Sequence, residues 1–300
     1  MSEYHTPVLL RPSVDALVTN VSGCYADATF GGGGHSREIL SRLDGKGRLI
    51  AFDRDADAAA GAPDDPRFKL IHNNFRFIHN YALIEAPEGM DGILADLGVS
   101  SHQFDTAGRG FSFRFDGPLD MRMNVQGDRT AADIVNSYTQ EELEKILKLY
   151  GEVDGAHKLA GLIVSARAKA PILTTGDLDN AIAGALPSFA EHKFLAKVYQ
   201  ALRIEVNDEM NSLEKFLRGA VRSLRPGGRL AVITYHSLED RLVKNFMRSG
   251  NVEGEERKDL YGRPLAPLTP LGRKPVTPDE SEIASNTRAR SAKLRVAQKN

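Results

Sequence analysis

A run of glycines, Gly31–Gly34, lies between a predicted strand at 23–28 and a predicted helix at 35–43. Glycines at such a turn let the backbone approach a ligand closely, and the start of a helix offers unpaired N–H groups. Asp53 follows Gly33 by twenty residues and ends the next predicted strand, where a carboxylate can accept hydrogen bonds from both hydroxyls of a ribose. Taken alone, the glycine run could be an ordinary tight turn, and Asp53 could be an acid that caps a helix. Together they favour a cofactor that contains adenosine.

Four aspartates at or near the carboxyl ends of predicted strands help to choose among such cofactors: Asp27, Asp53, Asp55 and Asp96. Open α/β sheets bind ligands at this edge. An acidic crevice suits the positive sulfonium of S-adenosylmethionine and repels a pyrophosphate. We therefore expect S-adenosylmethionine as the cofactor, and an NAD-dependent dehydrogenase is the competing enzyme class.

The elements that must position these aspartates alternate between strands and helices. Short apolar runs predict further strands at 47–52, 67–71 and 90–95, and the Ala-rich segment 55–60 is predicted to be helical. Strands separated by helices indicate βαβ units and a mostly parallel sheet.

The alternation stops after the fourth predicted strand. Residues 108–127 show little periodicity, and 130–202 have a helical pattern that Pro171 and Pro187 interrupt, with the clearest helix at 141–149. A mainly helical insert is therefore expected here.

The α/β pattern then returns. It predicts, in chain order, a helix at 208–224 stopped by Pro226–Gly228, a strand at 229–235, a helix at 237–248, a loop at 251–287 and a strand at 290–297. The predicted fold class is thus α/β with an inserted helical domain. We expect residues 1–105 and 206–300 to form the cofactor-binding domain and residues 106–205 to form the substrate-recognition domain.

Composition excludes several classes of protein. The 300 residues carry a net charge of −1, so the whole-chain charge gives no argument for nucleic-acid binding, although 288–300 holds five basic residues and no acid. No apolar run approaches the ~20 residues of a membrane span, and the first residues do not resemble a secretion signal. A single cysteine, Cys24, excludes an intramolecular disulfide, and the histidines show no metal-ligand spacing. We expect a cytoplasmic protein without a metal site.

Several segments together resemble the bacterial ribosomal RNA small subunit methyltransferase H family, from His5 to Arg295. They are Asp27–Ser36, DLGVSSHQ at 96–103, GRGFSF at 108–113, DGPLDMRM at 116–123, YGE at 150–152, QALRIEVN at 200–207, HSLEDR at 236–241 and RARSAKLR at 288–295. The resemblance implies a class I (Rossmann-like) enzyme that uses S-adenosylmethionine to methylate the exocyclic N4 of a cytosine. The target would lie near the decoding centre of 16S ribosomal RNA, within the small ribosomal subunit, and a homodimer is left open.

The same resemblance implies a set of cofactor contacts. Glycines and a histidine backbone would shape the pocket for the methionine part, and Asp53 would hold the ribose. Phe75 would contact the adenine or simply pack in the core. Asp96 and Gln103 would border the methyl-donor end. The full set is Gly33, Gly34, His35, Asp53, Phe75, Asp96 and Gln103.

The residues present also limit the chemistry. Methylation at carbon 5 of cytosine needs a thiolate, but Cys24 begins the first strand, at the end opposite the crevice. An exocyclic amine instead needs orientation and an oxygen that accepts its N–H. We expect Asp96, or a backbone carbonyl in 97–100, to be that acceptor, unless Asp96 only binds the cofactor. His236, at the end of the fifth strand, either touches the target base or caps a helix.

An aromatic and basic stretch offers RNA contacts in the insert. Phe111, Phe113 and Phe115 alternate with Arg109 and Arg114, which suits stacking on an extruded base or, equally, a hydrophobic plug.

Two segments depart from the family pattern: Val153-Asp154 replaces Glu-Arg, and Lys197-Val-Tyr199 replaces Arg-Thr-Phe. They leave the details of RNA contact open. An RNA-binding assembly factor with a vestigial cofactor pocket is the non-enzymatic alternative.

Overall fold

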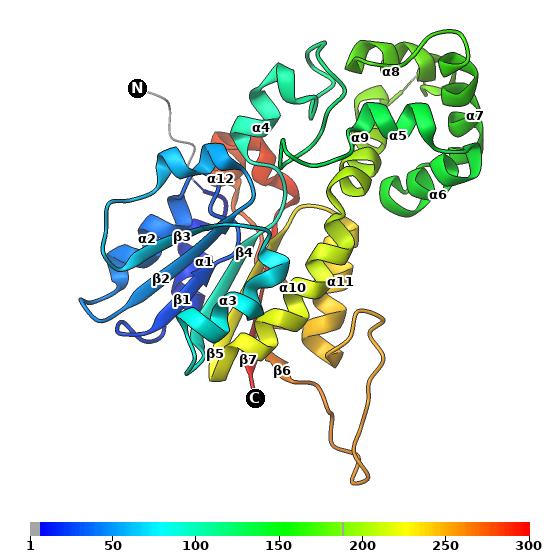
Figure 1. Cartoon of the computed structure of the whole chain (residues 1–300). Helices are drawn as coiled ribbons and strands as arrows, with labels where there is room; N and C mark the ends of the chain where they lie inside the picture. Colours follow the sequence, from blue (N-terminus) through cyan, green and yellow to red (C-terminus); the bar gives the residue numbers. More distant parts are fainter. Residues whose placement is uncertain (1–6, 188) are drawn as a thin grey trace. The chain divides into compact units, whose positions relative to one another are not determined.

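The computed structural model describes residues 7–187 and 189–300, so His5 and Thr6 of the family motif lie outside the described residues. The chain divides into two compact units (Figure 1). The sheet unit comprises Met1–Gly98 and Met210–Asn300, and the helical unit comprises Val99–Glu209.

The strands of the sheet unit form one seven-stranded sheet with the order β3-β2-β1-β4-β5-β7-β6. The pairs among β1 to β5 are parallel, whereas β7 runs antiparallel to both β5 and β6. The mostly parallel sheet is therefore confirmed. The strands are β1 (Cys24–Asp27), β2 (Arg48–Asp53), β3 (Phe68–His72), β4 (Met90–Asp96), β5 (Leu224–Thr234), β6 (Leu268–Pro270) and β7 (Lys293–Lys299).

Helices cover both faces of this sheet, and each face has its own apolar core. Alternate residues of the buried strands point to opposite faces, so that Ile93 of β4 packs under α3, α10 and α11 while Leu94 packs under α1 and α2. The helices are α1 (Leu10–Leu17), α2 (Gly34–Arg42), α3 (Ile78–Glu85), α10 (Glu209–Ser223), α11 (Ser237–Ser249) and α12 (Glu280–Ser285).

Three predictions about the sheet unit need correction. β5 begins at Leu224 rather than at residue 229, because Leu224 already pairs with Met90. A register shift then inserts residues 225–228 before Arg229 pairs with Gly92. The predicted loop at 251–287 contains β6 and α12, which are too short to give a periodic signal. The last strand is β7 at Lys293–Lys299, and a 3-10 turn precedes it.

The helical unit has a separate apolar core that its helices share. Thr130, Thr139 and Thr174 each begin a helix with a capping box, in which the threonine oxygen and an acid three residues later satisfy backbone N–H groups. The helical insert and its interruptions at the two prolines are confirmed. The helices are α4 (Ser101–Asp105), α5 (Ala131–Ser137), α6 (Gln140–Gly151), α7 (Ala156–Arg167), α8 (Thr175–Ile182) and α9 (Glu191–Asn207).

The departures from the family pattern lie inside this unit. Val153 and Tyr199 are buried in its core, and the Tyr199 hydroxyl donates to the carboxylate of Asp179 at 3.1 Å. Lys197 Nζ donates to the carbonyl of Glu152 at 2.8 Å. Val153 and Tyr199 therefore contribute to packing, and Lys197 ties α9 to the end of α6.

Within the part of the chain that the structure describes, no helix combines the length and the apolar character needed to cross a membrane.

We predict that Phe216→Ala lowers the free energy of unfolding by about 3–5 kcal/mol, because this fully buried ring supports α10. Leu83→Ala is the matched control: Leu83 is 64% exposed, so its loss should cost less than about 0.5 kcal/mol. Urea unfolding followed by circular dichroism measures both, and equal midpoints for the two variants would contradict the packing described.

Candidate active site at the carboxyl edge of the sheet

Asp27 ends β1 and ties this strand to the helix that follows. Its side chain is fully buried, with Oδ2 accepting from the Ser36 hydroxyl at 2.6 Å and Oδ1 accepting from the Thr29 N–H at 3.1 Å. Burial raises the pKa of Asp27 to about 6, although both hydrogen bonds act against this rise. The prediction that Asp27 faces the crevice is therefore wrong, because the carboxylate turns inward and shapes the glycine turn.

The four glycines of this turn serve two different purposes. Gly31 and Gly33 have φ of 52° and 74°, in the left-handed region that favours glycine. A Cβ at Gly33 would lie 2.7 Å from the Phe30 ring, and one at Gly34 would lie 2.1 Å from Pro7 Cγ, so packing alone requires these two glycines. A Cβ at Gly32 would meet no atom of the described chain within 4 Å. Gly32 is thus the position where the turn borders open space.

Asp53 ends β2 with its carboxylate held by backbone N–H groups. Oδ2 accepts from Gly31 and Oδ1 accepts from Asp55, both at 2.8 Å. Burial is the main cause that raises the pKa of Asp53, and these two bonds oppose it. A carboxylate has about four acceptor positions, so each oxygen can still accept one further hydrogen bond. The geometry therefore suits a ligand with two adjacent hydroxyls.

Asp96 ends β4 and is fixed by hydrogen bonds to two neighbouring segments. Its N–H donates to Thr29 Oγ1 at 2.6 Å, and its Oδ1 accepts from the Tyr235 hydroxyl at 2.7 Å. Burial raises the pKa of Asp96 to about 7, while the Tyr235 bond lowers it. The side chain is nevertheless 21% exposed, so a ligand can reach it. An accessible carboxyl group with a pKa near neutrality is suited to accept a proton.

His35 lies beside Asp96 but does not act as a cation there. Burial lowers the pKa of this imidazole to about 4, so the ring is neutral at neutral pH. Nε2 lies 3.2 Å from the carbonyl oxygen of Val8, which assigns the ring proton to Nε2. Nδ1 then has no proton to offer Asp96 Oδ2, 3.7 Å away. The His35 side chain packs the site, and only its backbone is left for the predicted cofactor contact.

Tyr235 is the residue that the sequence analysis missed. It follows β5 directly, and its ring lies against Gly98, where a Cβ would be 3.2 Å from Tyr235 Cδ2. Burial and the charge of Asp96 raise the pKa of its hydroxyl well above its usual value, so the hydroxyl remains a donor. Its place at the carboxyl end of a buried strand, just before His236, is the signal that could have identified it.

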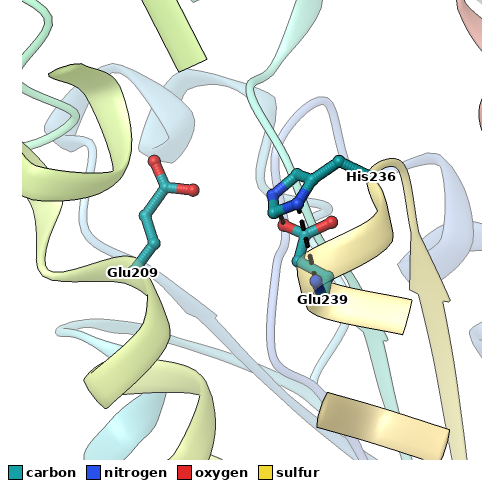
Figure 2. Close-up of side chains that lie close together, drawn as sticks. All are labelled: Glu209, His236 and Glu239. Carbon is teal, nitrogen blue, oxygen red and sulfur yellow. Dashed lines mark hydrogen bonds and ion pairs between the residues drawn. The ribbon is translucent and has the colours of Figure 1, made fainter. Parts of the chain in front are cut away.

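His236 caps α11. Its Nδ1 accepts from the Glu239 N–H at 3.5 Å, and Nε2 lies 3.1 Å from Glu239 Oε1 without hydrogen-bond geometry (Figure 2). The other carboxylate oxygen of Glu239 accepts from the Tyr235 N–H at 2.9 Å. The helix-capping alternative is therefore observed, and contact with a target base stays a prediction. Glu209, also drawn in Figure 2, belongs to the helical unit and pairs there with Arg203 at 2.9 Å.

Phe75 and Gln103 are the remaining predicted contacts. Phe75 follows β3, is half-buried and meets the Phe216 ring edge-on at 5.2 Å between centroids, so part of its surface serves packing. Gln103 lies in the helical unit, where its Oε1 accepts from the Ser100 N–H at 3.2 Å. The contact of either residue with a cofactor stays a prediction.

The aromatic stretch of the helical unit is mostly internal. Phe111 is buried, and Phe113 stacks on His192 at 5.8 Å and meets Tyr199 edge-on at 5.5 Å. Phe115 is 51% exposed. The hydrophobic alternative thus describes Phe111 and Phe113, and Phe115 is the member of the three that is free to stack on a base.

Cys24 begins β1, at the opposite end of the strand from Asp27, and its N–H donates to Asp91 Oδ2 at 2.9 Å. Burial raises the pKa of its thiol. The single cysteine of the sequence thus lies at the end of β1 away from the candidate site, as predicted.

The strand order, the single antiparallel turn-back at β7 and the acids at the carboxyl edge together define a class I, Rossmann-like methyltransferase fold. The sequence matches the MraW methylase family over residues 2–300, and the chain belongs to this family.

Relatives with assigned names agree with this family. The chain is 54% identical over 297 residues to the ribosomal RNA small subunit methyltransferase H of Parabacteroides distasonis, covering 99% of this chain and 97% of that one. It is 52% identical over 297 residues to the Flavobacterium johnsoniae protein of the same name, covering 99% and 98%. A solved structure of an rRNA methylase from Streptococcus thermophilus matches with 12% identity and a TM-score of 0.39, over 95% of this chain and 90% of that chain. The sequence matches confirm the family resemblance.

We predict that Tyr235→Phe raises the pKa of Asp96 further above its usual value, because the lost hydrogen bond favoured the charged carboxylate. A carbon-13 NMR titration of labelled aspartates measures this, with Asp96→Asn assigning the signal. Tyr261→Phe, at an exposed tyrosine, is the control and should leave the titration unchanged. An unchanged or lower pKa in Tyr235→Phe would refute the proposed bond.

Proposed function

We propose that this protein uses S-adenosylmethionine to methylate the exocyclic N4 of a cytosine in 16S ribosomal RNA, near the decoding centre of the small subunit. The observation that carries the proposal is the arrangement at one edge of the sheet unit. Gly32 borders open space, Asp53 retains two acceptor positions, and Asp96 is an accessible carboxyl group with a near-neutral pKa. Family membership and the names of the relatives support the same reaction.

The residues at this edge fit S-adenosylmethionine better than a dinucleotide. Asp53 and Asp96 offer negative charge, which attracts a sulfonium and repels a pyrophosphate. The acceptor positions left on Asp53 suit the two hydroxyls of a ribose. When bound, S-adenosylmethionine supplies an electrophilic methyl group.

Asp96 would orient the target amine and take up its proton. The N4 lone pair is delocalised into the cytosine ring, so the amine reacts only when it is held in line with the methyl group. The Asp96 carboxylate, fixed by Tyr235, would accept a hydrogen bond from N4–H and then the proton that N4 loses as the new C–N bond forms. Tyr235 acts through Asp96 and is a positioning residue.

The two units would divide the work. We propose that the cofactor-binding domain, predicted as residues 1–105 and 206–300, corresponds to the sheet unit, and that the helical insert recognises RNA. The substrate would be the assembled small subunit in the cytoplasm, and the stoichiometry, monomer or homodimer, is open to measurement.

The test of the proposal is methyl transfer from labelled S-adenosylmethionine into small subunits that lack the modification, with N4-methylcytidine identified in the digested RNA. Fully modified subunits are the matched control and should take up no label. Heat on titration with NAD but not with S-adenosylmethionine would favour a dehydrogenase. Cofactor binding without any methyl transfer would favour an assembly factor.

Asp96→Asn separates a catalytic role from a binding role. We expect turnover to fall by about 100-fold or more, with cofactor affinity within a few-fold of wild type, because an amide cannot accept the proton. The wild-type rate should rise with pH through about 7 as Asp96 ionises. Loss of binding in parallel with turnover, measured by calorimetry, would instead assign Asp96 to the cofactor alone.

A pair of glycine variants tests where the ligand lies. Gly32→Ala should leave the melting temperature unchanged, because its Cβ meets no described atom, yet weaken S-adenosylmethionine binding several-fold if the cofactor backs onto the turn. Gly34→Ala should destabilise the protein by about 1–3 kcal/mol through its clash with Pro7. Full cofactor affinity in Gly32→Ala would move the pocket away from this turn.

A further inference from the structure

Residues 251–267, here named the arm, connect α11 to β6 and extend away from the sheet (Figure 1). The two ends of the arm meet, since a Cβ at Gly250 would lie 2.6 Å from Pro267 Cδ. Leu268, the residue after the arm, pairs with Lys299 of β7. The arm is therefore a closed projection from the sheet unit and not an open linker.

The root of the arm is firmly held by one buried side chain. The Asn251 amide nitrogen donates to the carbonyls of Ser249 and Glu255, at 3.3 Å and 2.7 Å. Its Oδ1 accepts from the N–H groups of Gly254 and Glu255, at 2.8 Å and 3.0 Å. With its donors and its acceptor all engaged, Asn251 fixes the direction in which the arm leaves the unit.

The tip of the arm is shaped by the backbone and by Asp259. The Asp259 N–H donates to the Arg263 carbonyl at 2.9 Å, and the Leu265 N–H donates to the Arg257 carbonyl at 2.8 Å. Asp259 Oδ1 accepts from the N–H groups of Tyr261 and Arg263, both at 2.8 Å. Since these bonds form the turn, the side chains of the two tip residues are not needed to hold it.

Those tip side chains are Leu260 and Tyr261, with exposed fractions of 102% and 87%. Large apolar groups placed together on an ordered projection are typical of an interaction site. Removing them should cost the fold almost nothing, because they are nearly fully exposed.

Cations surround this apolar tip. Arg257, Lys258 and Arg263 are exposed, and none of their side chains has a hydrogen bond or ion pair with any residue in 7–187 or 189–300. The carboxylate of Asp259 is occupied by the turn, and the other acids of the arm lie nearer its root, at Glu253, Glu255 and Glu256. The outer arm, residues 257–263, thus presents an aromatic ring together with three cations and one acid, a net charge of +2.

The arm and the candidate active site lie at opposite edges of the sheet. Leu268, the residue after the arm, pairs with Lys299 near the end of β7. The neighbouring Gln298 of β7 pairs with Arg229 of β5. Tyr235 follows the last residue of β5, about 20 Å along the strand from Arg229. The arm therefore cannot serve the methylated base itself and would contact a second region of a large substrate.

We propose that the arm docks on ribosomal RNA remote from the target cytosine, with Tyr261 stacking on an unpaired base and Arg257, Lys258 and Arg263 contacting phosphates. This proposal rests on the proposed function. RNA is favoured over protein because free cations beside an exposed aromatic ring match phosphates and bases. With a net charge of −1 for the whole chain, such local contacts are needed to hold an RNA substrate.

Two arm variants and one control test the proposal by kinetics on unmodified small subunits. Leu260→Ser with Tyr261→Ser should raise KM about tenfold and leave kcat, melting temperature and S-adenosylmethionine affinity unchanged. Leu83→Ser with Ile84→Ser, an equally adjacent exposed pair on α3, is the control and should leave KM unchanged. An unchanged KM in the arm variant, or an equal rise in the control, would overturn the proposal.

The positive charges of the arm are tested separately, by the salt dependence of subunit binding. Replacing Arg257, Lys258 and Arg263 by glutamine should reduce the slope of log Kd for subunits against log salt by about 2–3, the number expected for three phosphate contacts. An unchanged slope would remove the phosphate contacts from the proposal.

The partner is identified by placing a photoreactive phenylalanine at position 261 of the full chain and irradiating its complex with small subunits. Cross-links to 16S ribosomal RNA are expected. Cross-links to a ribosomal protein or to a second copy of this chain alone would overturn the RNA assignment. This readout does not need methyl transfer, so a docked but inactive wild-type protein would refute the proposed function and still support the arm.

Discussion

The buried carboxylate of Asp27 is the interaction on which the site depends. It joins the end of β1 to Ser36 of α2 and to the N–H of Thr29, and the Thr29 hydroxyl in turn accepts from the N–H of Asp96. One inward-facing acid therefore sets the glycine turn and the end of β4 together. Its pKa is raised by burial from an unfolded value of about 4 to about 6, so the native state binds the proton more tightly. Its contribution to stability consequently falls as the pH rises through this window.

The same edge of the sheet gives different properties to acids of one type. Asp27 is closed off by its partners, Asp53 keeps acceptor positions beside backbone donors, and Asp96 stays accessible with a near-neutral pKa. A parallel sheet makes this division available because it brings the carboxyl ends of its strands to one edge. In the function proposed above, three aspartates thus have three roles: Asp27 shapes the turn, Asp53 holds a ribose and Asp96 accepts a proton.

Much of this arrangement could be predicted from the sequence, because strand-to-helix alternation and strand ends fix which residues share an edge. What the pattern does not contain is the direction of a side chain. Asp27 looks like its neighbours at strand ends until Ser36 is seen to turn it inward. The packing of Gly33 against Phe30 and of Gly34 against Pro7 is equally hidden in the sequence, and the predicted contact of these glycines with a cofactor stays a prediction. Tyr235 lies 139 residues after Asp96. Its place after a buried strand puts it at the same edge of the sheet, but the local sequence does not show that its hydroxyl bonds to Asp96. The start of β5 escaped prediction because a strand that runs through Pro226–Gly228 needs its partner strand to define it.

A crystal structure of the protein with S-adenosylhomocysteine, the demethylated cofactor, tests the proposed site most directly. We expect the ribose hydroxyls on the Asp53 carboxylate, the ligand against the backbone at Gly32 and the sulfur facing Asp96. A ribose bound elsewhere, with the Asp53 oxygens still engaged only by Gly31 and Asp55, would contradict it.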